Sequence, residues 1–276
     1  MKAQTLSVCL PGHACDKKCF YCVSKMTWAP AVNETIWMEN IHKVAHFARM
    51  AQVTDVILTG KGEPVLNGRL LHAAEVFKDW PVVVQTNGKH LAQNLSEHPD
   101  TLGSFKHIDI LAVSIDNPAQ MDEYQPIWDA TTNTRITSRI TVMLTPEVCE
   151  VPFQAWVEKC CANGIRGLSF REVTIPNDCV DTSIALETAN TIRKIIEGNK
   201  DSIKKWIENF VVSTASRPIL RKLPYGAVIK DFGGVSVTKF DYCLQDSSGD
   251  EDIRSLVYNQ DGHLYTSWSS SASIIF

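Results

Sequence analysis

The 276-residue sequence has no large excess of charge of either sign. It has 27 lysines and arginines against 31 aspartates and glutamates, a formal net charge of −4 at pH 7, which gives no support to a polyanion-binding surface. The basic residues Arg217, Arg221 and Lys222 form a local cluster that a solvated face explains. We therefore expect no nucleic acid polymer as a partner.

Signals for membrane insertion and secretion are also missing. No stretch approaches the ~18 consecutive apolar residues that a membrane-spanning helix needs. The short apolar stretch at the N-terminus is cut by Pro11 and Gly12, so it cannot form the apolar core of a signal peptide. We therefore expect a cytoplasmic protein without a membrane partner.

Repeats, low-complexity tracts and long linkers are absent, whereas cysteine is abundant. Apolar residues make up 44% of the chain and charged residues 21%, which is ordinary for a globular protein and argues against disorder. The sequence has nine cysteines. In a reducing compartment, such a count favours metal binding or catalysis over disulfides.

Up to about residue 200, apolar segments of strand length alternate with amphipathic segments of helix length. The continuous apolar character of the strands is typical of a parallel sheet covered on both faces. Six β-then-α units imply right-handed crossovers and either a doubly wound sheet or a barrel, complete or partial. The predicted strands are 5–10, 53–59, 82–86, 108–114, 139–144 and 167–173. The predicted helices are 37–51, 68–79, 89–98, 152–163 and 183–197.

The last third of the chain changes character to strands and turns. Short strands are predicted at 227–230, 235–240, 254–258 and 263–267. The four residues from Asn259 to Gly262 between the last two strands indicate a hairpin. We interpret residues 1–210 as one α/β domain and residues 211–276 as a small β-rich cap, with Trp268 and Phe276 in a lid.

The strongest functional signal is a loop with three cysteines after the first predicted strand. Cys15, Cys19 and Cys22 lie within eight residues, at spacings that let a wrapped loop bring three thiolates to one centre. Thiolate is the ligand that iron–sulfur clusters and zinc prefer. A structural zinc site with His13 as the fourth ligand, or a coincidence of buried cysteines, are the alternatives. Three ligands would leave one iron of a four-iron cluster open for a ligand.

The motif Cys-x3-Cys-x-aromatic-Cys after the first strand of a β/α succession resembles the signature of the radical S-adenosylmethionine (radical SAM) superfamily. The resemblance implies a 4Fe-4S cluster on Cys15, Cys19 and Cys22, whose open iron binds S-adenosylmethionine. It implies reductive cleavage of that cofactor to methionine and a 5′-deoxyadenosyl radical, which abstracts hydrogen from the substrate. Tyr21 has the aromatic position, which in the family lies near the adenine. The expected fold is then α/β, a partial (β/α)6 TIM-type barrel with a small β-rich C-terminal extension.

A second motif, Gly60-Lys61-Gly62-Glu63-Pro64, follows the second predicted strand. It resembles the Gly-Gly-Glu-Pro motif of the family, where the strand end receives the amino group of the methionine moiety. The resemblance makes Gly60, Gly62 and Glu63 cofactor-binding residues. A backbone that approaches a ligand closely favours glycine, and Lys61 stands where the family has its first glycine.

Polar residues end the next two predicted strands. Thr86, Asn87, Ser114 and Asp116 lie where the family binds the ribose and carboxylate of the cofactor, although helix N-caps explain Thr86 and Asn87 equally well. Active sites of barrels gather at this end of the strands.

Charged residues also occur inside two apolar strands. They are Arg139 and the pair Arg171–Glu172. Because a buried charge is costly unless it is paired or liganded, they indicate carboxylate binding or an internal ion pair. We include Arg171 among the cofactor-binding residues.

The remaining cysteines do not have the spacing of a second cluster. Only Cys160 and Cys161 are close in sequence, and free cysteine is often a small buried apolar residue. Residues 253–268 resemble the hairpin of twitch and SPASM extensions, but Thr266, Ser267 and Trp268 stand where those carry a cysteine. We predict one cluster, of about four irons per chain.

The sequence therefore predicts a radical SAM enzyme. We expect a small polar substrate such as a nucleoside, nucleotide or amino acid derivative, and a reducing partner such as flavodoxin or ferredoxin. The alternatives are a peptide-modifying maturase, and a non-catalytic iron–sulfur or zinc protein. Catalytic residues beyond the cofactor site are not assigned.

Overall fold

A computed structural model describes residues 2–176, 179–223, 227–240, 253–268 and 270–276, and within these ranges the strands form one open sheet. Its order is β11-β10-β1-β2-β3-β4-β5-β6-β9-β8-β7. The strands from β10 to β9 in this order run parallel to their neighbours, and β11, β8 and β7 are antiparallel additions at the two edges. The sheet does not close, which confirms the predicted partial barrel.

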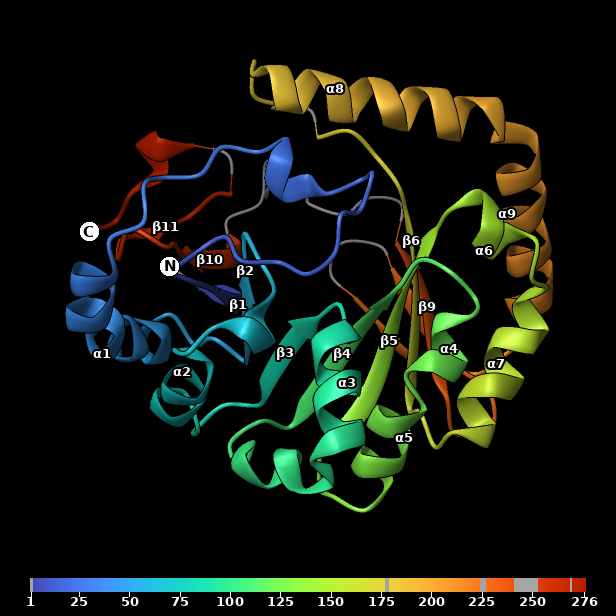
Figure 1. Cartoon of the computed structure of the whole chain (residues 1–276), viewed down its shortest axis with the longest axis horizontal. Helices are drawn as coiled ribbons and strands as arrows, with labels where there is room; N and C mark the ends of the chain where they lie inside the picture. The colour runs from blue at the N-terminus through green and yellow to red at the C-terminus, as the bar shows by residue number, and fades with distance from the viewer. Residues whose placement is uncertain (1, 177–178, 224–226, 241–252, 269) are drawn as a thin grey trace.

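The first six strands follow one another in both sequence and space, and helices connect them along the outer side of the curved sheet (Figure 1). The strands are β1 (Ala3–Leu10), β2 (Asp55–Gly60), β3 (Val82–Thr86), β4 (Ile110–Ile115), β5 (Thr137–Leu144) and β6 (Gly167–Glu172). The helices of these crossovers are α1 (Glu34–Met50), α2 (Leu70–Val76), α3 (Lys89–Glu97), α4 (Gln120–Glu123), α5 (Gln125–Thr132), α6 (Pro146–Cys149) and α7 (Phe153–Ala162).

The two faces of the sheet have different chemistry. On the helix side, apolar residues such as Leu6 and Val8 of β1 are fully buried, and burial of each such side chain stabilises the fold by about 1.5–3 kcal/mol. The residues between them point to the opposite face, which we call the inner face. This face is rich in hydroxyl and amide side chains, and its members include Ser7, Thr59, Gln85, Ser114, Thr141 and Ser169.

Two further helices follow β6. The helix α8 (Ser183–Ile192) lies across the carboxyl ends of the strands, and α9 (Lys200–Thr214) runs down beside α7 (Figure 1). Trp206 and Phe210 of α9 pack against Phe170 of β6, with ring centroids 4.7 and 5.8 Å from it. In the described ranges no helix has both the length and the apolar character to cross a membrane.

The C-terminal strands add to both edges of the same sheet. They are β7 (Ile219–Lys222), β8 (Val228–Asp231), β9 (Ser236–Phe240), β10 (Ile253–Tyr258) and β11 (Leu264–Tyr265). The chain places β9 beside β6 at one side and β10 beside β1 at the other, both in parallel register. Residues 211–276, predicted as a cap, thus contribute strands to the α/β sheet, and a domain boundary at residue 210 stays a prediction.

The expected lid over the barrel is wrong for Phe276. Its ring packs against Phe47 of α1, with centroids 6.0 Å apart, on the helix side of the sheet. Trp268 packs against the group formed by Cys9, Val257 and Tyr265. The predicted hairpin is confirmed, because β10 and β11 pair antiparallel across residues 259–263.

We predict that Gly262→Ala strongly destabilises the fold. Gly262 in the hairpin has φ +83°, and a Cβ there would lie 2.5 Å from the backbone nitrogen of Trp37 in α1. The strained φ costs about 1 kcal/mol, and displacement of the α1 backbone brings the expected loss to about 3 kcal/mol. Equilibrium denaturation measures it.

Gly233→Ala is the matched control. Gly233 has φ +67° but nothing within 4 Å of the added Cβ, so only the backbone strain is expected. Equal losses of stability in the two variants would contradict the packing of the hairpin on α1.

Candidate functional site

The three-cysteine loop leaves β1 at the carboxyl edge of the parallel strands and crosses above the neighbouring strand ends (Figure 1). Cys15 is exposed, whereas Cys19 and Cys22 are half-buried. Cys22 directly precedes a short 3-10 helix, Val23–Lys25. The three thiols therefore differ in solvent exposure, and all three lie in the loop at the carboxyl edge of the sheet.

The glycine-rich motif after β2 packs against the start of this loop. A Cβ on Gly62 would lie 2.3 Å from the carbonyl oxygen of Ala14, so a larger residue would push the loop away. The next backbone N–H, that of Glu63, donates to the same carbonyl at 2.7 Å. The motif thus fixes the chain one residue before Cys15.

Lys61, which departs from the family pattern, holds the segment that follows the cysteines. Its ammonium group donates to the Thr27 hydroxyl at 2.7 Å and to the Trp28 carbonyl at 3.0 Å. The loop is therefore tied to the end of β2 on both sides of its cysteines.

Glu63 links the ends of β2 and β3. Its carboxylate accepts from the Thr86 hydroxyl at 2.6 Å, from the Asn87 N–H at 2.7 Å and from the Val65 N–H at 3.0 Å. Burial raises the pKa of this carboxyl, and the three donors oppose the increase. In this structure Glu63 and Thr86 bind each other, and their predicted contacts with a cofactor stay predictions.

Asn87 extends this network to the cysteine loop. Its amide nitrogen lies 2.8 Å from an Asp16 carboxylate oxygen and 3.7 Å from the sulfur of Cys15. Lys89 donates to the Asp16 carbonyl at 3.3 Å and, through its N–H, to the Asn87 side chain at 2.9 Å. Asn87 therefore lies beside the first cysteine.

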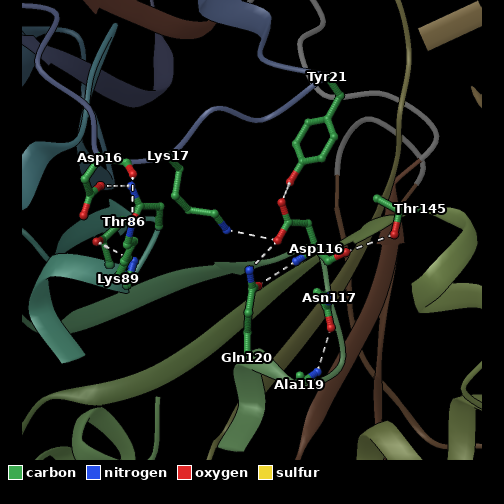
Figure 2. Close-up of polar contacts among 12 residues, drawn as sticks. Asp16, Lys17, Tyr21, Thr86, Lys89, Asp116, Asn117, Ala119, Gln120 and Thr145 are labelled. Carbon is green, nitrogen blue, oxygen red and sulfur yellow. Dashed lines mark hydrogen bonds and ion pairs between the residues drawn. The ribbon is translucent and has the colours of Figure 1, made fainter. Parts of the chain in front are cut away.

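Asp116, at the end of β4, binds two side chains of the loop at once (Figure 2). One oxygen accepts from the Lys17 ammonium at 3.0 Å, and the other accepts from the Tyr21 hydroxyl at 2.9 Å. Gln120 also donates to the carboxylate, at 2.6 Å, and Thr145 donates to the Asp116 carbonyl at 3.0 Å. This carboxylate therefore spans the loop on both sides of Cys19.

An apolar cluster covers the loop from above. Ala185 and Ala189 of α8 pack in one group with Met26, and Phe20 and Tyr21 lie against this group. Burial is the main reason that the pKa of the Cys19 thiol is raised to about 11. The pKa of Tyr21 is also raised, by burial first and then by Cys19 and Asp116. A thiol in this state releases its proton when it binds a metal.

Three other predicted cofactor residues lie on the strands of the sheet and not beside the cysteines. Gly60 is the last residue of β2 and pairs with Leu10. Ser114 is half-buried on the inner face, where it pairs in register with Thr141. Arg171 lies near the end of β6, and its guanidinium stacks 5.2 Å from the centroid of the Phe240 ring. These three residues line the strands below the loop.

The geometry of the described residues does not favour a single metal ion. No three His, Cys, Asp or Glu side chains in these ranges converge closely enough to hold one. Thiolates on one zinc ion lie about 3.8 Å apart, given Zn–S bonds of about 2.3 Å, whereas a four-iron cluster takes each cysteine on a different iron. His13, the proposed fourth zinc ligand, has its Nε2 3.3 Å from the Gln260 amide nitrogen. Three thiols spread along one loop suit a cluster, in which each can bind a different iron.

The remaining cysteines are distributed over the fold. Cys9 and Cys160 are buried, Cys149 and Cys179 are half-buried, and Cys161 is exposed. Cys243 lies outside the described residues.

Several residues that hold the loop were not predicted from the sequence. Asp16 binds Asn87 and Lys17 binds Asp116. Gln120 also donates a hydrogen bond to the Asp116 carboxylate. The sequence did show charged residues between the first two cysteines and polar residues at the ends of β3 and β4. Such a pairing is recognised only when the strand order is known.

Residues 5–137 match the family described as a 4Fe-4S single cluster domain, a range that contains the loop and the ends of β2, β3 and β4. No curated protein sequence matches the chain. The fold is similar to that of SuiB from Streptococcus suis. The structure of SuiB bound to the precursor peptide SuiA has a TM-score of 0.57 at 14% identity, and that of SuiB bound to S-adenosylmethionine has a TM-score of 0.54 at 15% identity. Both matches cover 96% of this chain, which spans about 60% of the length of SuiB.

We predict that Asp116→Asn impairs the loop. The amide carries no charge for Lys17 and offers one acceptor oxygen, so Lys17 or Tyr21 loses its partner, at a cost of about 1–3 kcal/mol. The melting temperature of the protein without iron should fall, and iron uptake on anaerobic reconstitution should fall to half or less.

Asp122→Asn is the control for this substitution. Asp122 lies in α4, pairs with Lys159 and is 77% exposed, so its loss should change neither quantity. Full iron uptake by Asp116→Asn would refute the role of Asp116 in positioning the loop.

Proposed function

We propose that this chain is a radical SAM enzyme that holds a 4Fe-4S cluster on Cys15, Cys19 and Cys22 and binds S-adenosylmethionine beside it. One observation carries the proposal. The three-cysteine loop is tied to the ends of β2, β3 and β4 and lies at the carboxyl edge of an open, polar inner face. Ligand sites of parallel barrels gather at this edge.

When bound, the cluster supplies an electron that cleaves S-adenosylmethionine to methionine and a 5′-deoxyadenosyl radical, which abstracts hydrogen from the substrate. The residues of this chain then have two kinds of role. Gly62, Glu63 and Asp116 keep the cysteine loop in place, as their contacts with Ala14, Asn87 and Lys17 indicate. The predicted cofactor-binding residues are Tyr21 in the loop and, on or just after the strands, Gly60, Gly62, Glu63, Thr86, Asn87, Ser114, Asp116 and Arg171.

The exposure of Cys15 supports delivery of the electron by a protein. Cys15 is exposed, whereas α8 and its apolar contacts cover the side of the loop around Phe20 and Tyr21. A flavodoxin or ferredoxin could approach the cluster on the Cys15 side.

A small polar substrate fits the inner face. Its half-buried residues, such as Gln85, Ser114 and Thr141, offer hydrogen bonds rather than a broad apolar surface. These groups would hold a polar substrate in one orientation, which limits the side reactions open to a radical. A nucleoside, nucleotide or amino acid derivative has the matching chemistry.

A peptide is the second candidate. The observation in its favour is the match of 96% of this chain to SuiB in complex with the precursor peptide SuiA. A short peptide could present one polar residue to the same inner face.

We predict that the anaerobically reconstituted protein holds about four irons per chain and forms 5′-deoxyadenosine with dithionite and S-adenosylmethionine. Substituting Cys15, Cys19 or Cys22 by alanine should abolish this product, because a missing thiolate leaves the cluster incomplete. Cys161→Ala, at an exposed position of α7, should leave both quantities unchanged.

Two results would contradict this prediction. One is a fully loaded cluster that forms no 5′-deoxyadenosine, with or without candidate substrates. The other is close to eight irons per chain, which would place a second cluster on the remaining cysteines.

The substrate class is tested by the rate of 5′-deoxyadenosine formation. We expect the low-molecular-weight fraction of an extract of the source cells to raise the rate, and the effect to survive digestion of that fraction with proteinase. Loss of the effect after digestion would reject the small metabolite and favour the peptide.

A further inference from the structure

The hairpin between β10 and β11 contacts the cysteine loop, although the two segments lie near opposite ends of the chain (Figure 1). Gln260 in this hairpin makes the contact through its side-chain amide nitrogen. The nitrogen lies 2.6 Å from the Pro30 carbonyl oxygen and 3.3 Å from the Nε2 of His13. Because an amide nitrogen only donates, both of these atoms accept. One side chain thus joins a residue before the three cysteines to a residue after them.

The hairpin is itself attached to the start of α1, so Gln260 has a fixed place. The backbone carbonyl of Gln260 accepts from the N–H of Asn33, the N-cap residue of α1, at 3.0 Å. Asn40 of α1 donates to the Gly262 carbonyl at 2.9 Å. The side chain of Gln260 therefore extends to the loop from a frame formed by β10, β11 and α1.

The amide of Gln260 is unfavourable for stability at this position. The residue is fully buried, and its side-chain oxygen has no hydrogen-bond partner among the described residues. A buried oxygen without a partner costs free energy, so an apolar side chain of the same size would give a more stable hairpin. What the amide adds is the two hydrogen bonds of its nitrogen. This points to a role in holding the loop.

The two hydrogen bonds fix the loop at both of its ends. Residues 14–29 lie between His13 and Pro30 and include all three cysteines of the loop. A segment whose two ends are held at one point has fewer conformations than a segment held at one end. Lys61 and Asp116 bind the same segment from the ends of β2 and β4. The contact with Gln260 adds a third support, from the C-terminal hairpin.

We propose that Gln260 is a positioning residue for the cluster, which acts by holding the two ends of the cysteine loop together. This inference rests on the proposed function, because it assigns a residue of the C-terminal hairpin to the site that holds the cluster. The family match covers residues 5–137 and does not include the hairpin. The cluster site of this chain therefore extends beyond the range of that match.

The test compares Gln260→Met with Asn40→Leu in the full chain. Methionine has nearly the shape of glutamine and cannot donate a hydrogen bond. Asn40→Leu removes a hydrogen bond between the same hairpin and α1 but none to the loop. In the iron-free protein, iodoacetamide alkylates the cysteines, and mass spectrometry gives the rate at each position.

Gln260→Met should raise the alkylation rates of the half-buried Cys19 and Cys22 about fivefold, the factor expected when one hydrogen bond that opposes local opening is lost. The exposed Cys161 is the internal reference, and its rate should not change. Asn40→Leu should leave all three rates unchanged.

A second variant decides the question if Gln260→Met does not fold. His13→Ala removes only one of the two contacts, at an exposed position, and should give a smaller increase at Cys19 and Cys22. No increase in that variant would count against the contact.

Reconstitution with iron gives a readout that a purely structural role would not change. The iron uptake of Gln260→Met should fall to about half or less, since contacts that orient the ligands govern metal affinity. The cluster that does form should need several-fold more S-adenosylmethionine for the change in its electron paramagnetic resonance spectrum. Asn40→Leu should match the unaltered protein in both quantities.

Equal alkylation rates at Cys19 and Cys22 in Gln260→Met and the unaltered protein would overturn the role of Gln260. So would an equal increase in Asn40→Leu, which would assign the effect to a general loosening of the hairpin. Unchanged iron uptake and an unchanged response to S-adenosylmethionine in Gln260→Met would overturn it as well. An unaltered protein that takes up no iron, combined with faster alkylation in Gln260→Met, would refute the proposed function and keep the role of Gln260 in holding the loop.

Discussion

The carboxylate of Asp116 is the contact on which the functional site depends most. One oxygen binds Lys17 and the other binds Tyr21, so one side chain at the end of β4 holds the loop on both sides of Cys19. Both members of the ion pair are less than one-fifth exposed, which makes the pair stronger than a surface ion pair. Glu63 has a similar role at the neighbouring strand ends, where its carboxylate links β2 to β3. Together with Lys61 and Asn87, which also bind the loop, these carboxylates fix the loop above the strands.

The two faces of the sheet have different roles, one in stability and one in chemistry. On the helix side the strands bury apolar residues, and this burial supplies the stability that lets the other face remain polar. The inner face keeps hydroxyls, an amide and two arginines in a half-buried setting. The N-terminal half of the sheet carries the cysteine loop and the motifs that support it.

Much of the fold could be predicted from the sequence, because local pattern determines it. The continuous apolar runs identified β1 to β6, and the strand Val82–Thr86 has the predicted bounds. The pairings of β9 with β6 and of β10 with β1 could not be predicted, since they join segments far apart in sequence and leave no periodic signal. The short helices α4 and α5 were missed because they have few residues and a proline at the start of α5. At the site, residue types and spacing indicated the cysteines, but only the strand order shows that Asp116 faces Lys17 and that Gly62 packs on Ala14.

We propose that Cys15, Cys19 and Cys22 hold a four-iron cluster with one iron left open to S-adenosylmethionine. Electron paramagnetic resonance of the reconstituted, dithionite-reduced protein tests it most directly, because the spectrum responds to a change of ligand at a single iron. We expect the signal of a reduced 4Fe-4S cluster, which changes shape when S-adenosylmethionine is added and is lost in Cys19→Ala. A reduced cluster whose spectrum is the same with and without S-adenosylmethionine would contradict it.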